Sequence, residues 1–106
     1  HGLFYLVLTM LGVRSNLEDS TDKGRIDCTL ELGNKVYVIE FKYGEKGTMK
    51  YLLDQAMNQI NNHKYYEPFE GLGKEIWLLG VGFLVKEDPK LKKPVLTIDG
   101  RVEQHV

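Results

Sequence analysis

Apolar and polar residues alternate between residues 25 and 42, which is typical of β-strands with one buried face. Two such runs, residues 25–32 and 35–42, flank the dipeptide Gly33-Asn34. Glycine and asparagine between two β-rich runs predict a two-residue hairpin turn. The register that this turn sets gives three residue pairs: Leu32 with Lys35, Thr29 with Val38, and Asp27 with Glu40.

The same register divides the predicted hairpin into an apolar side and a polar side. On the polar side Asp27 and Glu40 lie together, with Arg25 and Lys42 two residues along each strand. Cys28 falls on the apolar side, where we expect a buried small hydrophobe and not a nucleophile. The apolar side is made of Ile26, Cys28, Leu30, Leu32, Tyr37, Ile39 and Phe41.

Other segments carry the spacing of helices and strands. Thr48 is the expected N-cap of the second helix, because its hydroxyl can accept a backbone N–H of the first turn. The predicted elements are a helix over residues 3–11, a short strand over 13–18, a helix over 49–60, a central strand over 76–83 that is apolar on both faces, and an edge strand over 95–98.

Length and composition narrow the possible functions. A chain of 106 residues forms one domain, and a formal net charge of -1 gives no overall basic surface for nucleic acid. The single cysteine fits a reducing, cytoplasmic compartment, and no apolar run is long enough for a membrane span. Because the chain starts at His1, we expect a fragment, the C-terminal module of a longer protein.

The pairing of two carboxylates is the feature that suggests chemistry. Like charges opposed across a hairpin destabilise it, so Asp27 and Glu40 are either offset by neighbouring cations or bind a metal ion. Mg²⁺ commonly takes one or two carboxylates together with water and phosphate. Lys42 could then hold or deprotonate an attacking water. Spacing alone, however, favours surface salt bridges, Asp27 with Lys42 and Glu40 with Arg25.

A family resemblance changes this balance. Residues 24–27 (Gly-Arg-Ile-Asp) and, after twelve residues, 40–42 (Glu-Phe-Lys) resemble motifs two and three of the PD-(D/E)XK nuclease superfamily. The chain is most similar to the branch found C-terminal to AAA-type ATPase-like domains in bacterial proteins. The segments that carry this finer likeness are residues 1–4, 24–27, 38–42, 56–60, 64–65 and 80–83.

The resemblance implies an α/β (α+β) fold with a restriction-endonuclease-like α-β-β-β-α-β core, a mixed central sheet flanked by helices. It implies that Asp27 and Glu40 bind Mg²⁺ or Mn²⁺, with the carbonyl of Phe41 as a further ligand. It makes Lys42 the catalytic lysine. The single domain would then cover residues 1–106.

Four residues have weaker supporting roles. Many superfamily members carry an acid on the first helix, but no acid occurs between residues 1 and 16, so Glu18 is the expected substitute. Gln59 and Tyr65 match family positions beside the site, where they contact substrate or order the lysine. Arg25 is the fourth, as a neighbour of the paired acids.

A short basic run in the tail is read in two ways. Lys90, Lys92 and Lys93 could touch phosphates, although a solvated loop is the favoured account of them.

The leading hypothesis is a metal-dependent nuclease domain that cuts DNA or RNA with a metal-activated water. The alternative is a catalytically inactive module of the same fold that binds nucleic acid or protein and is attached to an ATPase. A purely structural remnant is the third possibility. The near-neutral charge and the missing first-helix acid motivate the alternatives.

Overall fold

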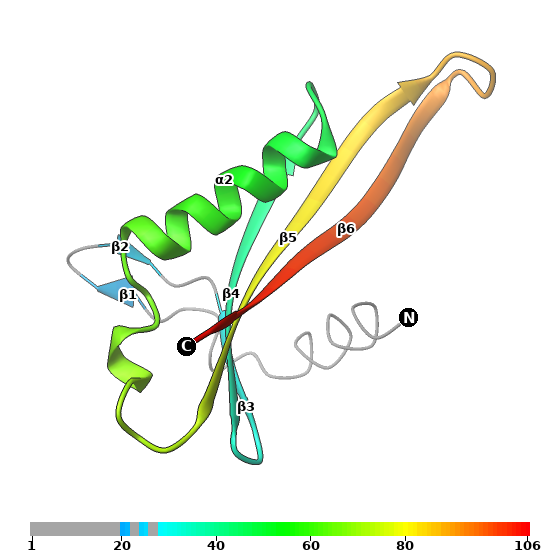
Figure 1. Ribbon diagram of the computed structural model, residues 1–106. Helices are drawn as coiled ribbons and strands as arrows, with labels where there is room; N and C mark the ends of the chain where they lie inside the picture. The colour runs from blue at the N-terminus through cyan, green and yellow to red at the C-terminus, as the bar shows by residue number, and fades with distance from the viewer. Residues whose placement is uncertain (1–19, 22–23, 26–27) are drawn as a thin grey trace.

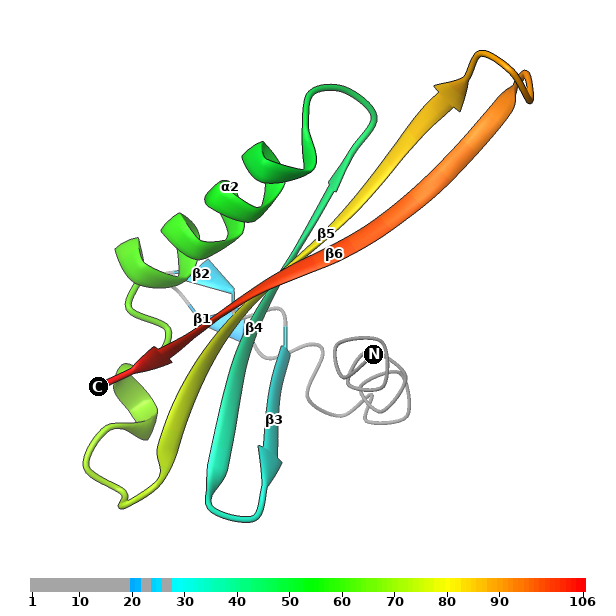
Figure 2. The same cartoon turned by 45° about the vertical axis from the view of Figure 1, so that its right-hand side comes forward.

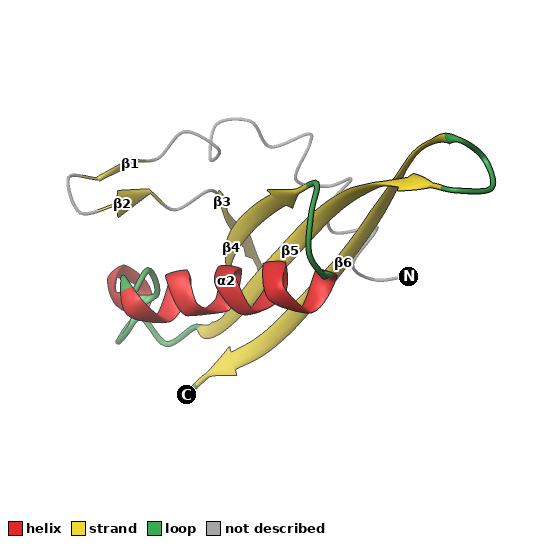
Figure 3. Cartoon of the chain, turned by 90° about the horizontal axis from the view of Figure 1, so that it is seen from above, coloured by secondary structure: helices red, strands yellow, loops and turns green. Residues whose placement is uncertain are grey.

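The computed structural model describes residues 20–21, 24–25 and 28–106 (Figure 1). Its sheet has four strands in the order β3-β4-β5-β6, and a helix lies along one face of it (Figure 3). The elements are β1 (Ser20–Thr21), β2 (Gly24–Arg25), β3 (Cys28–Leu32), β4 (Lys35–Gly44), α2 (Met49–Asn62), the short 3₁₀ helix η2 (Glu67–Phe69), β5 (Glu75–Asp88) and β6 (Lys93–His105).

The sheet is mixed. β3 and β4 are antiparallel, β4 and β5 are parallel and joined by the α2 crossover, and β5 and β6 are antiparallel. This arrangement confirms the predicted α+β class and is consistent with a restriction-endonuclease-like fold. The predicted helix over residues 3–11 and strand over 13–18 lie outside the described residues.

The predicted hairpin register is confirmed wherever the structure describes it. Leu32 pairs with Lys35 and Thr29 with Val38. Gly33 has a φ of 62°, and glycine adopts this left-handed geometry without the steric cost of a side chain. The expected pair of Asp27 with Glu40 lies outside the described residues, because the described ladder ends at Cys28 and Ile39.

Helix α2 forms for the reasons that the sequence suggests. The Thr48 hydroxyl accepts the N–H of Tyr51 at 3.2 Å, which caps the first turn. The apolar stripe of α2 packs on the sheet and forms one of two hydrophobic clusters, from Val36, Val38, Met57, Ile60, Tyr65, Ile76 and Leu78.

This packing corrects the prediction of a polar side on the hairpin. Val36 and Val38 alternate onto the same face of β4 as Glu40, and both are fully buried under α2. β4 is therefore apolar on both faces up to Val38. It becomes polar on the α2 side only from Glu40 onward.

The opposite face of the sheet carries the second hydrophobic cluster. Cys28 is fully buried in it, as expected, beside Ile39 and Leu79. Phe41 packs on this face against Phe83, with ring centroids 5.9 Å apart.

β5 is the predicted central strand, but the tail differs from the prediction. β5 continues to Asp88, and β6 spans thirteen residues where a short strand over 95–98 was expected. Most of β6 is exposed, so no buried alternation marks it in the sequence. Its backbone nevertheless pairs with β5 from Lys93 to His105, because ladder hydrogen bonds do not depend on side-chain polarity.

Polar contacts tie α2 and the turn after it to the edge of the sheet. Asp54 accepts hydrogen bonds from Lys50 on the same helix and from Arg101 on β6. These two cations hold the pKa of Asp54 below its usual value. His105 lies 2.8 Å from a Glu70 carboxylate oxygen and stacks on Tyr66, so the end of β6 is fixed against the segment that follows α2.

Candidate active site

Glu40 is a charged residue in the interior of the described structure. Its exposed fraction is 2%, and it lies on β4 where that strand passes under α2. Burial of a carboxylate is costly unless polar partners or a metal ion compensate it. The surface position expected for Glu40 from spacing alone is therefore wrong, while its expected pairing with Arg25 lies outside the described residues. A buried position suits a residue of a polar site.

Lys42 projects from the next position on the same face of β4. Its Nζ lies 3.5 Å from Oε2 of Glu40, and its side chain keeps 27% of its surface exposed. The separation is longer than a normal N–H···O hydrogen bond, so the contact is an ion pair without a tight hydrogen bond. Lys42 thus lies between the buried Glu40 carboxylate and the solvent.

Gln59 completes the surroundings of the lysine. Lys42 donates a hydrogen bond to Oε1 of Gln59, which belongs to α2. The Nε2 group of the same amide donates to the hydroxyl of Tyr65 at 3.2 Å. A lysine ammonium has only donors, so the carbonyl end of the amide faces Lys42 and the amino end faces the tyrosine.

Tyr65 is held in place by the chain reversal after α2. Lys64 adopts a left-handed φ of 51°, and the N–H of Tyr65 returns to the carbonyl of Ile60 at 3.1 Å. The tyrosine is 7% exposed and belongs to the cluster under α2. The structure therefore brings together four of the predicted site residues in one polar row: Glu40, Lys42, Gln59 and Tyr65.

Two glycines of β5 allow α2 to approach this row. Gly80 and Gly82 are the parallel-strand partners of Glu40 and Lys42. A Cβ at Gly80 would lie 2.9 Å from Cβ of Ala56, and one at Gly82 would lie 2.5 Å from the sulfur of Met49. Sequence reasoning noted these glycines only as part of the resemblance; their alternation within an apolar strand is the signal of close packing.

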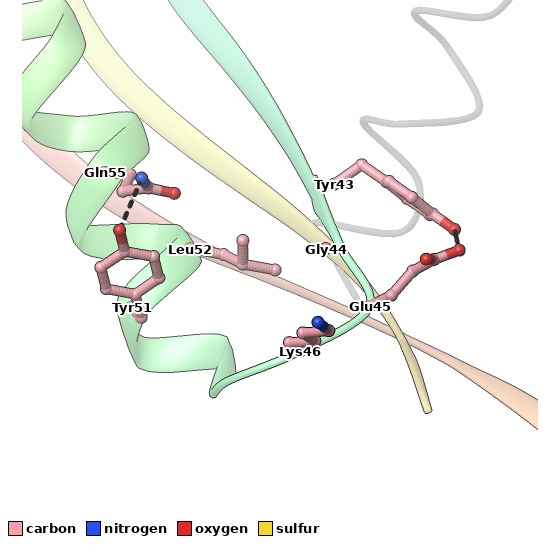
Figure 4. Close-up of a pocket in the computed structure, with 7 residues that line it drawn as sticks. All are labelled: Tyr43, Gly44, Glu45, Lys46, Tyr51, Leu52 and Gln55. Atoms are coloured by element: carbon pink, nitrogen blue, oxygen red, sulfur yellow. Dashed lines mark hydrogen bonds between the residues drawn. The ribbon is translucent and has the colours of Figure 1, made fainter. Parts of the chain in front are cut away.

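An open cleft lies at the end of β4 (Figure 4). Its volume is about 370 Å³, and it lies between the first turns of α2 and the loop that precedes them. At the edge of the cleft, the hydroxyl of Tyr51 accepts a hydrogen bond from Gln55, which lies one helical turn before Gln59. The lining residues are Tyr43, Gly44, Glu45, Lys46, Tyr51, Leu52 and Gln55.

Of the other predicted site residues, Phe41 lies on β4 with its ring on the opposite face of the sheet, and the side chains of Asp27, Glu18 and Arg25 are not described. Asp27 and Glu18 lie outside the described residues. The backbone of Arg25 pairs with Ser20 in the small β1–β2 ladder, but its side chain lies outside the description. Within the described residues, no group of three or more His, Cys, Asp or Glu side chains gathers as metal ligands. None of the described helices is long and apolar enough to cross a membrane.

Comparison with known proteins agrees with this geometry. The chain is similar to the uncharacterized protein in the vnfD 5′ region of Azotobacter chroococcum mcd 1, with 37% identity over 81 residues. The match covers 76% of this chain but only 15% of that protein. No solved structure matches the chain. The family model of the PD-(D/E)XK nuclease superfamily matches residues 1–92, and the chain therefore belongs to this superfamily.

Proposed function

We propose that this chain is a metal-dependent nuclease domain that hydrolyses nucleic-acid phosphodiester bonds, with Asp27, Glu40 and Lys42 as its catalytic residues. Membership of a nuclease superfamily supports the reaction class. The observation that carries the assignment is the position of Lys42. Its ammonium group lies 3.5 Å from the buried carboxylate of Glu40 and donates to Gln59.

The donor chemistry around Glu40 fits a hard divalent cation, Mg²⁺ or Mn²⁺. Glu40 offers carboxylate oxygens, and the next residue, Phe41, offers a backbone carbonyl. Continued by one pair beyond Cys28 and Ile39, the β3–β4 register predicts Asp27 opposite Glu40. Such an ion, when bound, supplies polarisation of the phosphoryl group and a lower pKa for the attacking water.

The roles of the side chains follow from their positions. As the neutral amine, Lys42 can accept a proton from the attacking water; as the ammonium, it stabilises charge that develops on the phosphate. Gln59 orients the lysine, because an ammonium group on a flexible stem needs a fixed acceptor to hold one direction. Tyr65 in turn holds the amide of Gln59. Glu18 is proposed to replace the missing first-helix acid, and Arg25 to lie beside the paired carboxylates.

Calorimetric titration of Mn²⁺ tests the metal site. Glu40→Gln preserves the size of the side chain but removes its charge. We therefore expect the affinity for Mn²⁺ to fall by more than roughly 100-fold, which exceeds the usual effect of losing a residue that only hydrogen-bonds to a metal ligand. Glu87→Gln is the matched control, since Glu87 is an exposed acid far along β5. Unchanged Mn²⁺ binding in Glu40→Gln, or no binding by the folded wild type, contradicts the assignment.

The positioning role of Gln59 makes a separate prediction. Gln59→Leu removes the acceptor of the Lys42 ammonium group, and hydrogen bonds to charged groups contribute about 1.5–3 kcal/mol. We expect kcat for cleavage to fall roughly 10-fold or more, with KM nearly unchanged. Gln55→Leu, one turn away on α2 and bonded to Tyr51, serves as the control. Equal kcat values for the two variants would show that Gln59 does not position the lysine.

A catalytically inactive module that binds nucleic acid or protein is the second candidate. The formal net charge of -1 favours its protein-binding form, because the chain lacks the overall basic character of many nucleic-acid-binding domains. Binding of an oligonucleotide in EDTA, combined with no cleavage in Mg²⁺ or Mn²⁺, would support this candidate over the nuclease.

The wider context of the domain is also a proposal. We propose that residues 1–106 act as one nuclease-like domain in a bacterial, cytoplasmic protein that also contains an AAA-type ATPase domain. The family likeness at residues 38–42 and 56–60 supports this setting. Sequencing of the flanking coding region, followed by a search for phosphate-binding glycine loops, tests it.

A further inference from the structure

The hairpin formed by β5 and β6 extends beyond the rest of the sheet. β4 pairs with β5 only as far as Gly44 and Leu84. Residues 85–88 of β5 and 93–96 of β6 pair with each other alone. Figures 1 and 2 show this end of the hairpin projecting past the start of α2 as a two-stranded ribbon. We call residues 85–96 the arm.

The arm is basic although the whole chain is not. Residues 86–93 contain four lysines and two acids, a formal charge of +2, whereas the chain as a whole carries -1. The lysines are all exposed, and none of them forms an ion pair with another described residue. They are Lys86, Lys90, Lys92 and Lys93.

Asp88, at the tip of the arm, accepts hydrogen bonds that stabilise the turn. Oδ1 of Asp88 accepts the backbone N–H groups of Lys90 and Leu91 at 2.7 and 3.0 Å. The carbonyl of Asp88 accepts the N–H of Lys92 at 2.7 Å, and Lys92 adopts a left-handed φ of 53°. The carboxylate is thus turned toward the backbone, and these bonds hold the backbone of the turn that carries three exposed lysines.

The arm and the candidate site share one face of β5. Alternation along the strand puts Lys86 on the same face as Gly82, the strand partner of Lys42. Lys93 pairs with Asp88 and therefore shares this face. Asp88 lies six residues beyond Gly82, so the tip is about 20 Å from it at a rise of about 3.4 Å per residue. That length corresponds to about six base-pair steps of DNA.

We propose that the arm binds the substrate as double-stranded DNA, with the lysines at its tip contacting phosphates about half a helical turn from the scissile bond. This inference rests on the proposed nuclease function. A two-stranded β-ribbon fits the major groove of B-form DNA. It does not fit the deep, narrow major groove of an RNA helix, so the shape of the arm favours duplex DNA over duplex RNA.

The test is a salt titration of binding by the full chain, in EDTA to prevent cleavage. The probe is a fluorescein-labelled 20-base-pair DNA duplex of mixed sequence, and the readout is fluorescence anisotropy. The variant carries Lys90→Gln, Lys92→Gln and Lys93→Gln. The matched control carries arginine at the same positions, which keeps the charge. Circular dichroism checks that both variants are folded.

We expect the glutamine variant to bind at least 10-fold more weakly at low salt. The slope of log Kd against log salt concentration should fall by about 0.9 for each phosphate that a lysine no longer neutralises, up to about 2.7 for three. The arginine variant should keep the wild-type slope. The same duplex made of RNA should bind more weakly to the wild type and respond less to the glutamine changes.

In the binding experiment, two outcomes overturn the proposal: no binding of the DNA duplex by the wild type, or an unchanged slope and Kd in the glutamine variant. Cleavage in Mn²⁺ separates this proposal from the nuclease function. If DNA is bound through the arm but never cut, the nuclease function is contradicted and the proposal that the arm binds DNA is retained. Cleavage by the glutamine variant at the wild-type KM contradicts the arm and leaves the nuclease standing.

Discussion

Replacement of Lys42 by alanine is expected to lower the rate of nucleic-acid cleavage by roughly 10²- to 10⁴-fold, the range for loss of a positioned proton-transfer group. The side chain is the cation that the structure places within 3.5 Å of the Glu40 carboxylate, and Gln59 orients it. Because Lys42 is partly exposed and lies at the edge of the core, the variant should remain folded. Single-turnover cleavage with saturating Mn²⁺ measures the effect on the chemical step.

Two further variants show whether the charge or its position matters. Lys42→Arg keeps a cation but replaces lysine, whose neutral amine can act as a base, by a guanidinium group that stays protonated, so it should remain strongly impaired. Lys50→Ala removes an exposed lysine that pairs with Asp54 on the outer surface of α2, and it should cleave at the wild-type rate. Wild-type cleavage by Lys42→Ala would remove the lysine from the mechanism.

The local parts of the fold could be predicted from the sequence. Gly33-Asn34 determines a hairpin register that the described pairs confirm, because a two-residue turn leaves the strands little freedom. Thr48 marks the start of α2 for an equally local reason, a hydroxyl three residues before the N–H that it accepts. Outcomes that depend on a few neighbouring residues are visible in a single sequence.

The parts that depend on distant contacts were not predictable. Alternation alone made the Glu40 side of the hairpin look open, whereas α2 covers it, and Glu40 is 2% exposed. The length of β6 was underestimated, because its residues are mostly exposed and its strand character comes from pairing with β5.

The candidate site shows the same division. The family resemblance pointed to Gln59 and Tyr65. Their spacing in the sequence, however, did not show how the two side chains would be connected to Lys42. The structure supplies that reason, a hydrogen-bonded row that runs from Lys42 through Gln59 to Tyr65. The bond between Arg101 and Asp54, 47 residues apart, left no local signal in the sequence. The predicted partner of Glu40, Asp27, stays a prediction.

Gly80 connects the packing of α2 with the candidate site, and its replacement is the second change with a large expected effect. In Gly80→Ala the new Cβ would lie 2.9 Å from Cβ of Ala56, an atom that cannot rotate away, and 3.1 Å from the sulfur of Met57. Overpacking of this kind costs about 1–3 kcal/mol of folding stability. Since α2 also carries Gln59, cleavage should fall in the same variant. Urea unfolding and the cleavage assay measure the two effects.

Gly44→Ala is the matched control, because its new Cβ comes closest to the flexible end of Leu52, at 3.1 Å, and meets the backbone carbonyl oxygen of Lys46 at an ordinary contact distance of 3.6 Å. Its free energy of unfolding should change by less than about 0.5 kcal/mol. Combining Gly80→Ala with Ala56→Gly removes the contact with Ala56 and leaves only the one with the flexible Met57 side chain, although glycine inside a helix itself costs about 1 kcal/mol. The loss of unfolding free energy in the double variant should therefore be smaller, by about 0.5–3 kcal/mol, than the sum of the losses in the two single variants. If the stability changes of the two single variants simply add, Gly80 is not required for the close approach of α2. The helix would then be positioned over Glu40 and Lys42 by other contacts, such as the bond between Asp54 and Arg101.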